Sequence, residues 1–289
     1  MSVCMKFCVT GLLVLNVFAH THAPVFGQRG GDVAIQPKEI NEKIYMLVGQ
    51  GGNIGFLSND NGVLLVDTQF QRLAPKIIKA VGELSQGKIQ YVLNTHHHGD
   101  HTGGNSVLGI DSIIVAHDNV RKRLNAGGKS GAFLPKVTYS KRLSMHFGDE
   151  EIQLLHLGPG HTDSDSVVYF KSSNVIHMGD LFFNKRYPFI DFRSGGSVRG
   201  YLSNIKIVAG MTNAKTKIIP GHGELATQTD LLSYIKMFEE CFGIVSKAKK
   251  NGKSLAEIKR IGLPKKYENW GKAFIDEEKW IGFLFAGAE

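Results

Sequence analysis

Cysteine is scarce in this chain, with three in 289 residues. Cys4 and Cys8 lie beside the N-terminus, so Cys241 stands alone in the rest of the sequence. If cleavage of an N-terminal signal peptide removes Cys4 and Cys8, no disulfide can form within the mature chain. Stability must then come from packing, and a chain of this length is long enough to bury a sizeable core.

Long hydrophobic runs are equally scarce, since none follows the apolar stretch Cys8–Ala19, which comes just after Lys6. This stretch is too short to span a bilayer comfortably and has the length of the apolar part of a signal peptide. We therefore predict that residues 1–27 are a signal peptide and that the protein is exported, periplasmic or secreted. We expect no stable membrane insertion after cleavage. A membrane-anchoring helix that stays in place is the alternative.

Basic tracts interleaved with aromatic residues are also missing, although the formal net charge is +8. The lysines are dispersed, with short clusters at Lys247–Lys253 and Lys259–Lys266 that are typical of solvated helix faces. We therefore expect no nucleic-acid partner and predict a small-molecule substrate instead.

The order of expected elements predicts an α/β protein with one domain over residues 28–289. Two β-rich halves, each followed by helices, favour a four-layer αβ/βα sandwich of two mixed β-sheets flanked by helices. The strands are expected near residues 33–36, 44–48, 54–58, 63–67, 90–93, 112–116, 137–139, 143–147, 152–155, 166–170, 174–178 and 217–219. Helices are expected near residues 71–86, 118–125, 197–210, 229–250, 255–260 and 270–285. Residues 126–136 are expected to form a loop that exposes Phe133 and Leu134.

Side chains that can bind a metal ion are most concentrated in the stretch NTHHHGDHTGG, from Asn94 to Gly104. Imidazole and carboxylate groups at such short intervals suit a borderline-soft divalent cation, zinc above all. His96 and His98 are two residues apart, so their side chains point the same way in an extended chain. Asp100 and His101 follow where the backbone turns, and they can face a second point. One loop can therefore supply ligands to two neighbouring metal ions.

Three further polar residues stand at predicted strand ends beside glycine: His161 in GPGHT, Asp180 in HMGD and His222 in PGHGE. Small neighbours let the backbone approach a site closely. Any one of these residues alone is more often structural than a ligand. Together with the histidine-rich loop they predict one shared metal site.

These motifs resemble those of the metallo-β-lactamase-fold hydrolases. The run T-H-H-H-G-D-H is similar to the family signature H-x-H-x-D-H, and VLLVDT resembles the strand before its first helix. The resemblance implies two Zn²⁺ ions, although other divalent metals are possible. It implies that His96, His98 and His161 hold the first ion. For the second it implies Asp100, His101 and His222, with Asp180 bridging the two ions or completing the second site.

The resemblance also implies roles around the ligands. Asp100 would be catalytic, orienting the attacking water and shuttling its proton. Asp67 would brace the metal loop without being a ligand. His97 should point away from His96 and His98, and we favour a hydrogen-bonded loop residue over a functional donor. A histidine at position 98 also argues for zinc and hydrolysis, because the redox di-iron relatives carry a carboxylate there.

The function that follows is an exported dizinc hydrolase, β-lactamase-like, in which a metal-bound hydroxide attacks an amide or ester carbonyl. Asp180 departs from this pattern, because the best-known lactamases carry cysteine there, and Phe183 stands where they carry lysine. Lys185, Arg186 and Arg193 are candidate substitutes for that lysine. A lactonase- or thioesterase-type hydrolase is the alternative, with Tyr187 as a candidate oxyanion-stabilising phenol. A non-catalytic metal-binding protein is the alternative of a different class.

Overall fold

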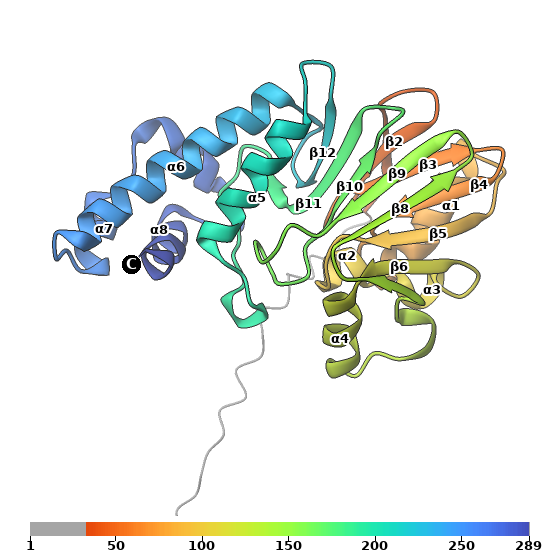
Figure 1. Cartoon of the computed structure of the whole chain (residues 1–289), viewed down its shortest axis with the longest axis horizontal. Helices are drawn as coiled ribbons and strands as arrows, with labels where there is room; N and C mark the ends of the chain where they lie inside the picture. The colour runs from red at the N-terminus through yellow and green to blue at the C-terminus, as the bar shows by residue number, and fades with distance from the viewer. Residues whose placement is uncertain (1–32, 289) are drawn as a thin grey trace, which may run out of the picture. The chain divides into compact units, whose positions relative to one another are not determined.

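Two β-sheets lie face to face in a computed structural model of the chain, which describes residues 33–288 (Figure 1). The first sheet follows chain order: β1 Gln36–Glu39, β2 Ile44–Val48, β3 Ile54–Asn59, β4 Gly62–Val66, β5 Ile89–Asn94, β6 Ile113–His117 and β7 Val137–Tyr139. The second has the order β13 Ala226–Thr227, β12 Lys217–His222, β11 Val175–Phe183, β10 Val167–Phe170, β9 Glu150–Leu155 and β8 Arg142–Phe147. Both sheets mix parallel and antiparallel pairs.

Strand β4 shows why the sheets stack. Its side chains alternate between two cores, because successive residues of a strand point to opposite faces. Leu64 and Val66 pack toward the second sheet, while Val63 and Leu65 pack toward the helices on the outer face. All four are fully buried, as expected for a strand that is covered on both faces.

Helices cover the outer face of each sheet. The helical segments, with 3₁₀ helices marked η, are η1 Gln71–Leu73, α1 Ala74–Leu84, α2 Gly99–Thr102, α3 Asn105–Leu108, α4 Asp118–Ala126, η2 Gly131–Phe133, η3 Phe192–Ser194, α5 Val198–Met211, α6 Gln228–Lys250, α7 Leu255–Ile261, η4 Lys265–Lys272 and α8 Glu277–Gly287. Helices α1 and α3 pack on the first sheet, and α5, α6 and α8 pack on the second (Figure 1). The predicted four-layer sandwich is confirmed.

Several expected boundaries are corrected. The first strand lies at Gln36–Glu39, later than predicted, and β11 runs on to Phe183, so Asp180 lies within a strand. Phe133 and Leu134 are buried against α4, because η2 folds the loop inward, and the prediction that they are exposed was wrong. The single helix expected over residues 270–285 is divided into η4 and α8.

The predicted signal peptide, residues 1–27, lies outside the described residues and stays a prediction. Among residues 33–288, no helix combines the length and the apolar character needed to cross a membrane.

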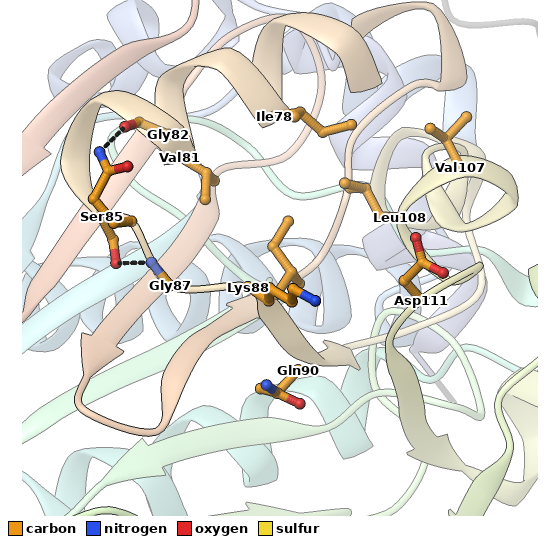
Figure 2. Close-up of a pocket in the computed structure, with 12 residues that line it drawn as sticks. Ile78, Val81, Gly82, Ser85, Gly87, Lys88, Gln90, Val107, Leu108 and Asp111 are labelled. Carbon is orange, nitrogen blue, oxygen red and sulfur yellow. Dashed lines mark hydrogen bonds between the residues drawn. The ribbon is translucent and has the colours of Figure 1, made fainter.

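A cavity of ≈ 670 Å³ opens between α1, β5 and α3 (Figure 2). Its lining combines apolar side chains such as Ile78, Val81 and Leu108 with polar ones such as Lys88 and Asp111. None of the predicted ligands lines it, so it is separate from the histidine-rich loop.

Candidate metal centre

The histidine-rich loop starts where β5 ends and then turns into the short helix α2. His96 comes before the turn, while Asp100 and His101 lie on α2, so the loop presents ligands in two directions as predicted. Gly52 lies directly against this helix, because a Cβ atom built on it would fall 2.1 Å from His101 Cε1. Only a residue without a side chain lets the turn between β2 and β3 close over His101.

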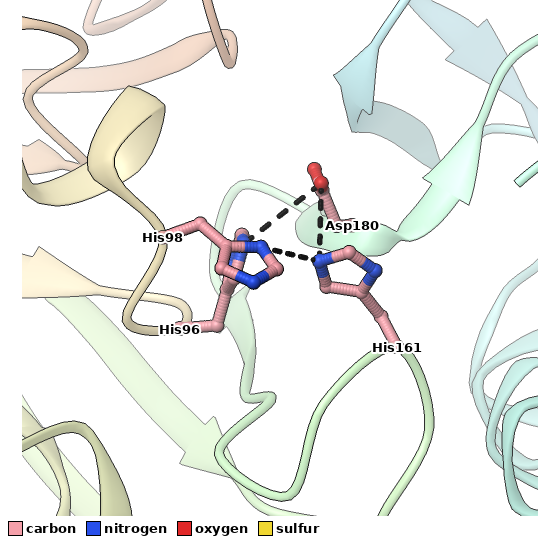
Figure 3. A group of neighbouring side chains, drawn as sticks. All are labelled: His96, His98, His161 and Asp180. Atoms are coloured by element: carbon pink, nitrogen blue, oxygen red, sulfur yellow. Dashed lines mark hydrogen bonds and ion pairs between the residues drawn. The ribbon is translucent and has the colours of Figure 1, made fainter. Parts of the chain in front are cut away.

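The structure brings all seven predicted ligands together. They form two groups, in each of which the nitrogen and carboxylate-oxygen atoms lie within 4.8 Å of one another. The first contains His96, His98, His161 and Asp180, and the second contains Asp100, His101 and His222. Figure 3 shows the first group, with its members arriving from the histidine-rich loop, the His161 loop and β11.

Asp180 faces both groups, with one carboxylate oxygen toward each. Its Oδ2 atom lies 3.4 Å from Nε2 of His161 and 3.8 Å from Nε2 of His96. Its Oδ1 atom lies 3.1 Å from Nε2 of His101 and 3.4 Å from Nε2 of His222. Gly221 on the neighbouring strand permits this position, because a Cβ atom there would fall 2.1 Å from Oδ1. The carboxylate therefore has the orientation of a bridging ligand.

Four of the imidazoles are anchored through their outer nitrogen. His161 Nδ1 donates to the carbonyl of Phe189 at 2.8 Å, and His101 Nδ1 donates to Asp67 at 2.7 Å. His98 Nε2 donates to Asp191 at 3.0 Å. His96 Nδ1 donates to the Thr95 hydroxyl at 3.1 Å, because that hydroxyl gives its own hydrogen to the Asp67 carboxylate. Each acceptor orients its ring so that the inner nitrogen faces the position where a metal would bind.

The inner atoms are orphaned in the way a metal site requires. Within residues 33–288, no hydrogen bond reaches a set of five buried ligand atoms: His96 Nε2, Asp100 Oδ2, His101 Nε2, Asp180 Oδ1 and His222 Nε2. An unsatisfied buried polar atom costs about 1–3 kcal/mol. A divalent cation in each group would satisfy these atoms, so the residues present fit a two-metal centre.

Comparison with known proteins agrees with this geometry. Residues 47–222 match the model of the metallo-β-lactamase superfamily, which is more than half of the chain. The chain belongs to the metallo-β-lactamase superfamily. It is 23% identical over 184 residues to "Metallo-beta-lactamase type 2" of Bacillus sp. (strain 170), covering 63% of this chain and 71% of that protein. It is 27% identical over 184 residues to "Probable hydroxyacylglutathione hydrolase SPCC13B11.03c" of Schizosaccharomyces pombe, covering 62% and 67%.

A solved structure supports the fold. A metallo-β-lactamase from Pontibacter korlensis superposes with a TM-score of 0.63 at 16% identity, covering 71% of this chain and 99% of that one. The fold of that chain is therefore matched over almost its whole length, and residues that follow position 222 lie beyond the matched family region.

The two metal groups of this superfamily member differ in charge. Burial lowers the pKa of His96, and it lowers that of His161 to about 4 despite the nearby Asp180 carboxylate. In the second group burial also acts to lower the pKa of His222, but Asp180 and Asp100 outweigh it and raise that pKa to about 9. The same balance raises the pKa of His101. His96 and His161 thus offer neutral imidazoles at neutral pH, while His101 and His222 hold protons that a metal must displace.

Sequence reasoning missed Asp191, which accepts from His98 and lies in the long loop after β11. Burial acts to raise the pKa of this carboxyl, but hydrogen bonds from His98 and Ser194 outweigh it and hold the pKa well below the usual range. No local pattern marks it, because it is a single acidic residue among aromatics. The predicted brace Asp67 is present, since it accepts from Thr95 and His101.

Two further side chains are settled by their contacts. His97 lies 3.1 Å from the Ser164 hydroxyl and 3.3 Å from that of Ser194, which fits the favoured interpretation as a hydrogen-bonded loop residue. The prediction that Tyr187 stabilises an oxyanion was wrong. Its ring is buried, and its hydroxyl donates to the carbonyl of Tyr267 at 3.1 Å, so the phenol serves packing.

Proposed function

We propose that the protein is an exported dizinc hydrolase that cleaves an amide or ester-type bond at a carbonyl. The observation that carries this proposal is the convergence of five orphaned ligand atoms on two groups that share Asp180. Membership of the metallo-β-lactamase superfamily supports hydrolysis. The apolar stretch Cys8–Ala19 supports export through a signal peptide at residues 1–27.

Most of the site residues would hold metal ions, and one of them would also move a proton. His96, His98 and His161 would hold the first ion, and Asp100, His101 and His222 the second. Two bound zinc ions would supply a water of lowered pKa and would polarise the carbonyl under attack. Asp180 places one negative charge between the groups, which reduces the repulsion between two cations.

Asp100 has the position of a general base. Its Oδ2 atom is buried, lacks a hydrogen-bond partner among residues 33–288, and lies 3.4 Å from His222 Nε2 and 3.7 Å from His101 Nε2. Burial acts to raise the pKa of this carboxyl, but the two imidazoles outweigh it, so the group is ionised at neutral pH. With Oδ2 on the second ion, the other oxygen of the ionised carboxylate can orient a water and take its proton.

A β-lactam is the first substrate to test, because the relative from Bacillus is named a metallo-β-lactamase. A lactone or thioester is the second candidate. It is favoured by Asp180, a carboxylate where the best-known lactamases carry cysteine, and by the relative named for hydroxyacylglutathione hydrolysis. In both cases the partner is a small molecule.

The test is a panel of chromogenic β-lactam, lactone, thioester and phosphodiester substrates, with metal content measured on the same sample. We expect turnover that a chelator abolishes and zinc restores. Asp100→Asn should lower kcat by about 100-fold or more. Asp111→Asn is the matched control, because Asp111 is exposed and lines the separate cavity. A protein that holds two zinc ions and hydrolyses none of the panel would be a non-catalytic binder, and the proposal would fall.

A further inference from the structure

Four phenylalanines form a continuous cluster beside the first metal group, which we call the aromatic wall: Phe189, Phe192, Phe274 and Phe283. Phe189 packs against Phe274 with ring centres 6.0 Å apart, and against Phe283 at 5.6 Å. Phe283 continues the contact to Phe192 at 6.0 Å. These rings meet at steep or tilted angles, the arrangement that aromatic pairs prefer.

The wall touches the metal ligands directly. The Phe189 ring lies 6.1 Å from that of His98 and 5.6 Å from that of His161. The carbonyl of Phe189 also holds His161 Nδ1. His98 is the exposed edge of its group, since its side chain is 17% exposed while those of His96 and His161 are almost fully buried. The wall therefore borders the side from which solvent reaches the first group.

Two members of the wall expose large apolar surfaces at this edge. Phe192 is 41% exposed and Phe274 is 44% exposed, whereas Phe189 and Phe283 lie partly buried beneath them. An exposed apolar patch next to a reactive centre marks a surface that binds a ligand. The four rings offer no hydrogen-bonding group to a ligand, and the Lys279 ammonium lies 5.7 Å from the centre of the Phe274 ring. The ligand part that matches the rings themselves is therefore apolar.

Half of the wall lies outside the matched family region. The family match ends at residue 222, but Phe274 and Phe283 come from the segment before α8 and from α8 itself. They meet Phe189 and Phe192, which come from the long loop after β11. The C-terminal helices thus add a surface to a site whose metal ligands come from the common core.

We propose that the aromatic wall binds the apolar acyl part of the substrate, so that the enzyme prefers esters, thioesters or lactams of aromatic or long aliphatic acids. This inference rests on the proposed hydrolase function. With the acyl group against Phe192 and Phe274, the attached carbonyl lies toward His98 and His161. The wall therefore sets both which acyl group binds and where its carbonyl is placed.

The experiment compares the zinc-loaded protein with Phe192→Ala and Phe274→Ala on acetyl, butanoyl, hexanoyl and phenylacetyl thioesters. In the unchanged protein kcat/KM should rise by about fourfold for each methylene that the wall covers. In both variants this rise should largely disappear, because KM for the longer acyl substrates increases. Leu232→Ala is the control, because Leu232 on α6 is 51% exposed and outside the wall.

Product binding gives a readout that needs no turnover. Phenylacetate should bind the metal-free protein more tightly than acetate by calorimetry, and both wall variants should lose that difference. An acyl-length preference that persists in both variants, or equal binding of the two acids by the unchanged protein, overturns the inference while leaving the hydrolase proposal intact. If the protein hydrolyses none of the substrates but still binds phenylacetate more tightly than acetate, the proposed function is refuted and the wall remains a binding surface.

Discussion

Replacing Asp67 with asparagine should weaken the second metal group more than the first. Asp67 is fully buried and accepts from the Thr95 amide at 2.8 Å, the Thr95 hydroxyl at 2.7 Å and His101 Nδ1 at 2.7 Å. Its φ of 67° lies in the left-handed region, which asparagine tolerates well. The substitution therefore changes the hydrogen bonding without straining the backbone.

The expected loss of zinc affinity follows from the one hydrogen-bond acceptor that His101 loses. The amide oxygen of asparagine can keep the Thr95 amide, and the Thr95 hydroxyl can turn to accept from the new NH₂ group. His101 cannot donate to that NH₂ group. Its hydrogen bond to a charged acceptor is worth about 1.5–3 kcal/mol. If the ring changes tautomer instead, Nε2 carries the hydrogen and cannot bind a metal. We expect affinity for the second ion to fall by about 10- to 100-fold.

The assay is calorimetric titration of zinc into the metal-free protein, with Asp191→Asn as the reciprocal variant. Asp191 anchors His98 of the first group as Asp67 anchors His101 of the second. Each variant should weaken a different binding step, and circular dichroism should show that both are folded. Unchanged binding in Asp67→Asn, or weakening of the same step in both variants, would refute the anchoring argument.

Three further predictions follow from the described contacts. Zinc binding at pH 7 should release protons from the second group but not the first, because the pKa of His222 is raised to about 9 and that of His161 is lowered to about 4. Affinity at the second group should therefore rise with pH up to about 9, and calorimetry in buffers of different ionisation enthalpy measures this. Gly221→Ala should abolish most turnover in the substrate panel and lower the melting temperature, since its Cβ would lie 2.1 Å from Asp180 Oδ1 and 2.6 Å from the Gly179 carbonyl carbon. Gly82→Ala on α1, where a Cβ meets nothing within 4 Å, should instead raise the free energy of unfolding by about 0.5–1 kcal/mol in thermal melts.

The ligands were predictable because local sequence carries their signal. His96, His98, Asp100 and His101 lie within one short stretch of sequence, and each of the remaining ligands stands beside a glycine. The strand positions were predictable for a similar reason, since the apolar runs are short and bounded by turn residues.

Other features depend on contacts between distant segments, which no local pattern records. Asp191 meets His98 across 93 residues, and the aromatic wall joins the loop after β11 to the C-terminal helices. Phe133 and Leu134 were misjudged because a glycine-rich stretch favours an exposed loop, whereas η2 turns both side chains into the core beside α4.

The single carboxylate of Asp180, with one oxygen toward each group, would link metal binding in one group to metal binding in the other. An ion that fixes one oxygen also fixes the other, so occupancy of one group changes the affinity of its neighbour, and thermodynamics makes the change equal in both directions. The protein would then respond to metal supply as a coupled pair rather than as two independent sites. Any change that moves β11 relative to β12 would alter the cooperativity with which the two groups bind metal ions.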